Sequence, residues 1–446
     1  MGACFRGTQN VEGFHGTPLR FAQEALRVDR TLRSMAFSQS HLVKASTVCG
    51  LISASFIGFP HAWVSGWLVL AGIFIALCVS KAKVAPQFRF LVFSAWCFAV
   101  CVVARFAMSL IASAPLSFSG FGHYFAVAAM VLLAVRIAPF ISTERATLTI
   151  VASAVLIPIL FTVSQFVEGK DHRVLRSYQT YSGNDSIWIG IALAIAAAGC
   201  TLEAVRNVGR KRSATCARYW VLAAGFTFFL TQAGHSRMGL LIFLIATATG
   251  VLLIPSTTPL QRNAKIASVL GALVLCLGSP TARDGIRVAA LEVEGAIVRH
   301  EVHHSTSQGQ RLALFSVSKH IWLEAPVFGH GLGTWRSEFS KKVPPQWVNA
   351  IGSHSSPHNE YVHILTQMGI VGFFAFLMLL LAFGLTGYRA LRLAGSPWLY
   401  VLSVAAACAS ITNVFFWDFR FFSPFSAWIL CALAAVSTAS DRSKNR

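Results

Sequence analysis

The histidine at position 358 stands where the longest polar segment of the chain runs into a new apolar helix. It follows Pro357, and Asn359 after it suits the N-cap of that helix. An unperturbed imidazole titrates near neutral pH, so it can take a proton from a hydroxyl group and release it again. His358 is therefore a candidate general base at a membrane surface. The alternative is an interfacial histidine without a chemical role.

Arginine side chains are the second set of groups that could do chemistry. Arg237 stands at the outer end of a predicted apolar helix, where a cation is costly unless it pairs or lines a wet cavity. Arg311 opens a predicted loop helix, and Arg173 and Arg176 lie in a shorter loop. The planar guanidinium fork fits phosphate and pyrophosphate oxygens. Together these groups favour a site for an anionic ligand, whereas contact with lipid headgroups is the alternative for Arg237.

A metal-binding site is the main alternative to a site that works without a metal ion. His300, His303 and His304 have the i, i+3 and i+4 spacing of a ligand face on a helix. Pro357, however, interrupts the helical spacing between His354 and the histidine that follows it. The acidic residues expected on the same side form no DxD pair that would hold a metal ion against a diphosphate. The sequence therefore predicts no metal site and no cofactor.

The elements that must hold these groups are strongly apolar. Of the 446 residues, 55% are hydrophobic and only 12% are charged, which is too little charge to cover a soluble protein. Segments long enough to cross a bilayer recur along the chain. We therefore predict an all-α polytopic membrane protein with about twelve transmembrane helices. The predicted spans are 43–59, 62–80, 90–113, 121–139, 147–167, 186–204, 219–234, 238–254, 264–280, 360–385, 397–416 and 421–439.

The net charge of +20 raises the question of nucleic-acid binding, but the distribution of the charge argues against it. Basic residues concentrate in alternate short loops, for example at 81–89, 206–218 and 389–392. This is the positive-inside pattern of cytoplasmic loops. It predicts both termini in the cytoplasm and agrees with an even number of spans. We expect membrane lipids, and no nucleic acid, as partners.

One loop on the outer side is far longer than the others. A long loop in a compact fold is usually functional. Apolar periodicity predicts helices over Asp284–Val302 and Gly309–Glu324, and the glycines of 329–333 predict a turn. The chain then divides into five parts: an N-terminal arm 1–42, spans one to nine at 43–280, the large loop 281–359, spans ten to twelve at 360–439, and a tail 440–446.

Four motifs follow one another in order in the second half of the chain. They are an arginine and a tryptophan within 309–322, P-x-x-G-x-G-x-G within 325–335, H-N-x-Y at 358–361, and G-x-x-G at 369–372. Each motif alone carries little information, but the ordered set is fairly specific. It resembles the O-antigen ligase family, which includes polysaccharide polymerases and protein O-oligosaccharyltransferases.

The resemblance implies a GT-C-like fold in which the large loop faces the periplasm and carries short helices. It also implies a metal-independent, inverting glycosyl transfer at the periplasmic face of the bacterial inner membrane. The donor would be a glycan on undecaprenyl pyrophosphate. The acceptor would be a sugar hydroxyl of lipid A-core, and the product would belong to lipopolysaccharide biosynthesis.

The same resemblance implies roles for individual residues. His358 would be the general base that deprotonates the acceptor hydroxyl. Arg237 looks like part of the family's other arginine motif, and Arg176 more weakly resembles a segment before the sixth helix. Three arginines would bind the pyrophosphate: Arg176, Arg237 and Arg311. Three further residues would support the site: Gly329, Gly331 and Asn359.

Other functions stay open within and outside this family. An O-antigen or exopolysaccharide polymerase would use a second lipid-linked glycan as its acceptor, and an oligosaccharyltransferase would use a serine or threonine of a protein. A twelve-helix transporter would instead show charged or broken helices at mid-membrane and repeated halves. Here the polar residues gather on one side of the membrane and in one loop, so the sequence favours a ligase.

Overall fold

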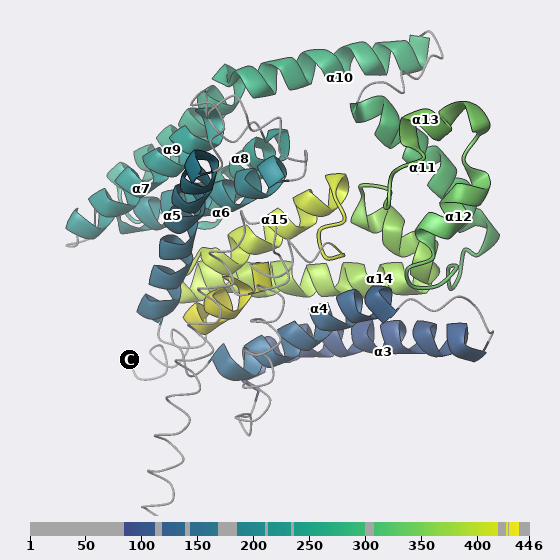
Figure 1. Ribbon diagram of the computed structural model, residues 1–446. Coiled ribbons are helices and arrows are strands. Elements are labelled where there is room, and N and C mark those ends of the chain that lie inside the picture. The colour runs from purple at the N-terminus through teal and green to yellow at the C-terminus, as the bar shows by residue number, and fades with distance from the viewer. Residues whose placement is uncertain are drawn as a thin grey trace, which may run out of the picture.

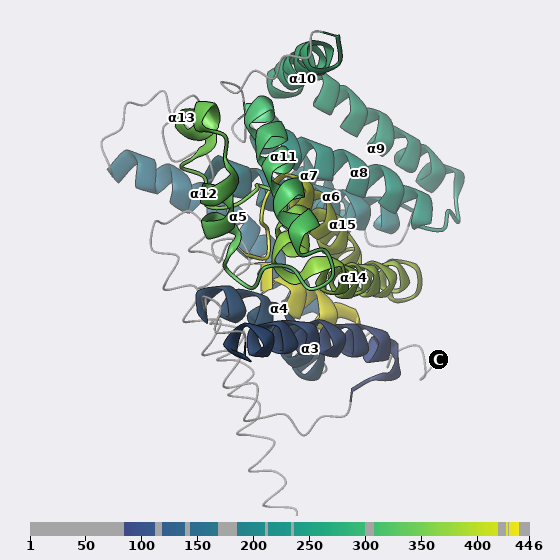
Figure 2. The ribbon, with the colours of Figure 1, turned by 90° about the vertical axis from the view of Figure 1, so that its right-hand side faces the viewer.

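The computed structural model describes most of the chain beyond residue 83, and every element within the described part is a helix (Figure 1, Figure 2). The described residues are 84–111, 118–138, 143–167, 185–209, 213–232, 236–298, 307–417, 425–426 and 428–436. The predicted arm 1–42, the spans 43–59 and 62–80, and the tail 440–446 lie outside these residues. For the described part, the all-α prediction is confirmed.

The long apolar helices coincide with the predicted spans to within a few residues. They are α3 (Arg89–Ile111), α4 (Phe118–Ile137), α5 (Thr143–Val167), α6 (Asp185–Asn207), α7 (Ser213–Gln232), α8 (Arg237–Leu253), α9 (Pro259–Gly278), α14 (Glu360–Arg389) and α15 (Trp398–Thr412). A short 3-10 turn, Pro86–Phe88, leads into α3. The seventh and eighth predicted spans are separate helices, α7 and α8.

Four described segments are long and apolar enough to cross a membrane: Pro86–Ile111, Ile189–Asn207, Pro259–Gly278 and Glu360–Leu393. Other apolar helices are shorter; the 17 residues of α8 extend only about 25 Å at the rise of an α-helix. These helices are those of a helical membrane protein. The total of twelve spans and the GT-C-like fold stay predictions.

Helix α6 lies at the centre of the bundle and is almost wholly buried. It packs against α7 and α8, while α14 packs against α3 and α15. Small residues allow the close approach of α6 and α8, because a Cβ on Gly239 would lie 2.5 Å from the carbonyl oxygen of Gly190. Such contacts between small residues are common where helices associate in a membrane.

The predicted large loop is mostly helical. Its elements are α10 (Pro280–Val298), α11 (Ser307–Glu324), α12 (Trp335–Lys342), a 3-10 turn (Pro345–Trp347) and α13 (Val348–Ile351). The two predicted loop helices correspond to α10 and α11, although α10 begins four residues earlier than expected, with only Ser279 between it and the end of α9. Figure 1 shows α10 running away from the bundle and α11 to α13 gathered beyond one end of α14.

The helices α11 to α13 have a small hydrophobic core of their own. It contains Leu314 and Ile321 of α11, Trp335 and Phe339 of α12, and Ile351 of α13. The Trp335 and Phe339 rings stack with centroids 4.6 Å apart, and Trp335 Nε1 donates to Ser318 Oγ at 3.0 Å. This core gives the loop a rigid body that can position side chains above the membrane helices.

Helix α14 is interrupted at Gly369, which has φ 63° and ψ −164°. This region of backbone conformation is accessible essentially only to glycine. The helix interruption frees two amide groups, and both find partners in the turn after α11. Ile370 N donates to Pro326 O at 2.9 Å, and Val371 N donates to Val327 O at 3.3 Å.

A Gly369→Ala substitution should destabilise the protein strongly. An added Cβ would lie 2.2 Å from Val327 O and would also meet the backbone of Phe328. The unfavourable backbone conformation alone costs about 1–3 kcal/mol. We expect a clear fall in the thermal unfolding midpoint in detergent. Gly384→Ala on the same helix is the matched control, since a Cβ there meets nothing within 4 Å. Equal midpoints for both variants would contradict this account of the kink.

Candidate functional site

His358 occupies an unusual backbone position directly before α14. Its φ of 50° makes it the single non-glycine residue with positive φ among the described residues. Its ring is half-buried, and Nε2 lies 3.0 Å from Nδ1 of His354, with the two rings nearly perpendicular. Strained backbone at a non-glycine residue persists only where surrounding contacts enforce it, and such positions concentrate at functional sites.

Asn359 supplies one of those contacts. Its Oδ1 accepts a hydrogen bond from Val362 N at 3.0 Å, which confirms the predicted N-cap of α14. Its Nδ2 donates to Ile411 O at 2.8 Å, and the next residue, Glu360, donates its N–H to Asn413 O at 3.1 Å. The segment that carries His358 is therefore fastened to the end of α15.

Glu360 fixes the first turn of α14 from inside the protein. Its side chain is fully buried. Tyr124 of α4 donates its hydroxyl to Oε1 at 2.8 Å, while Phe416 N and Trp417 N donate to Oε2 at 2.8 and 3.3 Å. Three distant parts of the chain thus meet at one carboxylate two residues after His358.

A chain of buried polar groups continues along α14. The Tyr124 hydroxyl lies 3.0 Å from Nδ1 of His363, and Nε2 of His363 pairs with the side-chain amide of Gln367. The side-chain oxygen Oε1 of Gln367 accepts a hydrogen bond from Gly333 N. This network was not predicted from the sequence. Its signal is the i, i+3 and i+7 spacing of Glu360, His363 and Gln367 on an otherwise apolar helix.

The glycine-rich turn lies across α14 at the kink. Gly329 and Gly331 both have positive φ, at 69° and 120°. His330 N donates to Thr366 O at 2.9 Å, and Gly331 N donates to Gln367 O at 3.0 Å. The hydrogen bonds from His330 and Gly331 therefore anchor the turn to α14 about two helical turns after His358. The support that Gly329 and Gly331 are expected to give the site stays a prediction.

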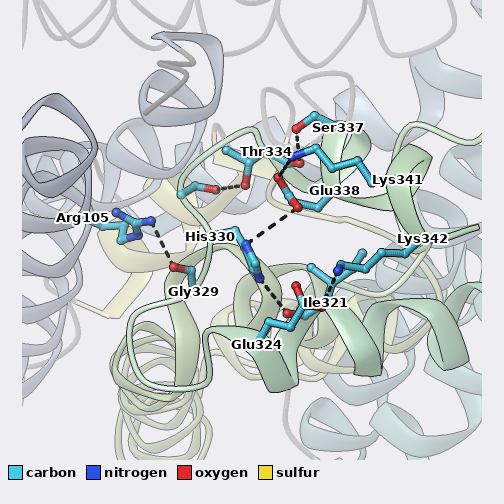
Figure 3. A network of polar contacts seen from close by, with 11 residues as sticks. Arg105, Ile321, Glu324, Gly329, His330, Thr334, Ser337, Glu338, Lys341 and Lys342 are labelled. Carbon is cyan, nitrogen blue, oxygen red and sulfur yellow. Dashed lines mark hydrogen bonds and ion pairs between the residues drawn. The ribbon is translucent and has the colours of Figure 1, made fainter. Parts of the chain in front are cut away.

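Arg105, for which the sequence suggests no role, holds the other side of this turn (Figure 3). Its Nη2 donates to Gly329 O at 3.0 Å and its Nη1 to Ser109 Oγ at 3.1 Å. A Cβ on Gly331 would approach Arg105 Nη2 to 3.3 Å, so the glycine leaves room for the guanidinium. An arginine of α3 thereby ties the membrane helices to the loop.

Polar contacts around the same turn join α11 to α12 (Figure 3). Nε2 of His330 lies 2.7 Å from Ile321 O, and its Nδ1 lies 4.0 Å from Glu338 Oε2. Lys342 pairs with Glu324, and the hydrogen bond from this ammonium group lowers the pKa of the Glu324 carboxyl. These contacts fix the angle between α11 and α12 at the exposed surface.

Arg105→Ala should loosen the glycine-rich turn. The lost hydrogen bond involves a charged donor, and such bonds contribute about 1.5–3 kcal/mol. We expect a fall of about 2 kcal/mol in the free energy of unfolding, measured by denaturation in detergent, and a smaller fall for Arg105→Lys. Arg287→Ala, at an exposed position of α10, is the control. Arg105→Ala as stable as this control would show that the Gly329 contact contributes nothing.

Arg237 is the first residue of α8, after the N-cap Ser236, whose Oγ accepts from Gly239 N at 3.1 Å. The arginine is exposed, and its side chain lies along α10, because a Cβ on Gly285 would sit 2.8 Å from Arg237 Cδ. Glycine at 285 therefore lets the side chain pass across the helix. The guanidinium extends from the membrane bundle toward the loop helices.

Arg311 lies in the second turn of α11 and is half-buried. Helix α11 packs against α10 and α14, and α10 also packs against α8. The helices near these residues therefore contact one another in turn: α8 with α10, α10 with α11, and α11 with α14. Arg237 begins α8, Arg311 lies in α11, and His358 comes directly before α14. Their convergence on one ligand stays a prediction.

Several candidate site residues lie outside the described residues: Arg173, Arg176, His300, His303 and His304. With Glu301, the residues 300–304 have the HExxH spacing of zinc-binding helices. Within the described ranges, His, Cys, Asp and Glu form no group of three that could hold a metal ion. The expected absence of a metal site stays a prediction for the whole chain.

Residues 220–377 match the family model described as O-antigen ligase. The matched region begins in α7 and ends within α14, so it contains Arg237, Arg311, the glycine-rich turn and His358. No curated protein shows a significant match to the chain. The family match confirms the resemblance that the ordered motifs predicted.

Proposed function

We propose that this chain, whose residues 220–377 match the O-antigen ligase family model, is a membrane enzyme that transfers a glycan from undecaprenyl pyrophosphate to a sugar hydroxyl of lipid A-core. The main observation behind the proposal is the fixed position of His358, whose half-buried imidazole lies directly before the N-terminus of the apolar helix α14. This histidine lies inside the matched region. The proposed product is a component of lipopolysaccharide.

In the proposed reaction, His358 takes the proton of the acceptor hydroxyl while that oxygen attacks the anomeric carbon of the donor sugar. The bond from this carbon to the pyrophosphate oxygen breaks, so the configuration inverts and undecaprenyl pyrophosphate leaves. A general base of this kind contributes about 10²–10⁴-fold to the rate. The fixed backbone at His358 supports this role, because a base must be held within hydrogen-bond reach of the proton it takes.

The charge that grows on the leaving pyrophosphate needs cationic groups nearby. We assign Arg237 and Arg311 to this task, and Arg176 as a third arginine outside the described residues. Guanidinium groups bind pyrophosphate oxygens in pairs, and donors fixed in advance in a partly dry site stabilise such charge effectively. The exposure of Arg237 and the half-buried Arg311 are compatible with access by a ligand.

The proposed substrates also account for the location of the site. A polyprenyl chain stays in the bilayer, so its pyrophosphate can be reached only at the membrane surface. We place the enzyme in the bacterial inner membrane with the site facing the periplasm and both termini in the cytoplasm. The positive-inside distribution of basic residues supports this orientation.

The direct test is transfer by the purified protein in detergent or vesicles. The reaction would contain the lipid-linked glycan, lipid A-core and EDTA. We expect glycan-bearing lipid A-core without added metal. Product formed only with a second lipid-linked glycan would instead identify a polymerase of the same superfamily. No transfer to either acceptor would overturn the enzyme proposal and favour the alternative of a transporter.

Arg237→Ala and Arg311→Ala should each impair the use of the donor. Removing one donor to a developing charge typically lowers the rate about 10²–10³-fold, and partial exposure to water places these arginines nearer 10²-fold. We expect a lower kcat and a higher KM for the lipid-linked donor, with KM for lipid A-core unchanged. Arg287→Ala of α10 serves again as the control. Wild-type donor kinetics in both variants would remove the arginines from the site.

A further inference from the structure

Two histidines form a close pair in the loop before α14. Nδ1 of His354 lies 3.0 Å from Nε2 of His358, and the rings are inclined by 85°. The distance is that of a hydrogen bond between one donor nitrogen and one acceptor nitrogen. The direction of this bond decides what His358 can do.

The two possible directions have different chemical consequences. If Nε2–H of His358 donates to His354, then Nδ1 of His358 carries a lone pair that can take a proton. If His354 donates instead, the His358 lone pair at Nε2 is occupied and its Nδ1 carries hydrogen. In neutral His358, therefore, the first direction alone leaves a nitrogen that can act as a base.

The surroundings of His354 keep its ring neutral and hold the loop that carries it. Burial lowers the pKa of its imidazole, so the ring stays neutral at neutral pH and offers a lone pair. Its backbone N–H donates to Ile351 O at 3.2 Å. Arg336 of α12 donates from Nη1 to the carbonyl oxygens of Ser353 and His354 at 3.1 and 3.3 Å. Hydrogen bonds to α13 and from α12 therefore hold the loop that carries the His354 ring.

We propose that His354 is a positioning residue for His358: it accepts the Nε2–H hydrogen bond, fixes the tautomer with a basic Nδ1, and stabilises the imidazolium that forms. This inference rests on the proposed function, in which His358 is the base. As the acceptor hydroxyl gives its proton to Nδ1 of His358, Nε2–H continues to donate to His354. A neutral imidazole would then hold the place that a carboxylate holds in a catalytic triad.

The test compares two variants of His354 with the exposed His320→Ala as control. His354→Ala removes the acceptor, and we expect kcat for glycan transfer to fall about 10- to 100-fold with KM for the donor unchanged. His354→Asn places an amide oxygen near the position of Nδ1, so it should recover most of the lost kcat. Thermal unfolding of each variant separates loss of activity from loss of fold.

The outcomes also separate this inference from the proposed function. Normal kcat in His354→Ala, or equal loss in the Ala and Asn variants with unchanged stability, would overturn the positioning role. Normal transfer by a variant without the His358 imidazole would overturn the proposed base itself. EDTA-sensitive activity restored by Zn²⁺, together with loss of Zn²⁺ binding in His354→Ala, would show that the two nitrogens bind a metal ion instead of each other, and this too would overturn the inference.

Discussion

His358→Asn is expected to abolish glycan transfer while the protein stays folded and inserted in the membrane. Asparagine tolerates positive φ better than alanine does, so it fits the backbone at φ 50°. Its amide cannot take a proton at neutral pH. Loss of the base should lower kcat about 10²–10⁴-fold. Transfer by purified protein, measured beside the thermal unfolding midpoint, checks both parts of the prediction.

A comparison with His358→Ala sharpens this result. The alanine variant also lacks the base, but alanine is less favourable in the left-handed region, so its unfolding midpoint should lie below that of the asparagine variant. Equal loss of activity with different stability would separate the chemical role from the backbone strain. Wild-type transfer by the asparagine variant would remove His358 from the reaction.

Glu360→Ala should have the largest effect on stability. The substitution leaves the Tyr124 hydroxyl and two backbone N–H groups, of Phe416 and Trp417, without their carboxylate. Leaving a buried donor without its hydrogen-bond partner typically costs about 1–3 kcal/mol, and three donors are affected here. We expect a large fall in the unfolding midpoint and in the yield of monodisperse protein, and transfer activity should fall with it.

Glu360→Gln tests the same network more gently. The amide keeps the size of the side chain and one carbonyl acceptor, so its loss of stability should be smaller than that of the alanine variant. Glu144→Ala, at an exposed position in the first turn of α5, is the matched control. A Glu360→Ala protein as stable as this control would show that the carboxylate does not hold the start of α14.

Local sequence signals predicted those parts of the fold that depend on local physics. Apolar runs marked the long helices, and the polar side chain of Asn359 after Pro357 marked the start of α14. The periodicity of 309–324 marked α11. The short helices α12 and α13 were missed, because eight and four residues carry too little periodicity to distinguish a helix from a loop.

The supports of the candidate site could not be predicted, because they join residues far apart in the chain. Tyr124 and Glu360 are 236 positions apart, and Arg105 and Gly329 are 224 apart. The kink at Gly369 likewise depends on the turn after α11, which supplies the acceptors for two free amides. Spacing along one helix indicates that such polar groups need partners, but only the fold identifies them.

The central claim is that Arg237, Arg311 and His358 serve one bound donor. A cryo-electron microscopy map of the protein with an undecaprenyl pyrophosphate-linked glycan tests this most directly. We predict pyrophosphate density in contact with Arg237 and Arg311, and the His358 ring facing the side of the anomeric carbon from which the acceptor attacks. Pyrophosphate density at the basic loop near 206–218, away from all three residues, would contradict the claim.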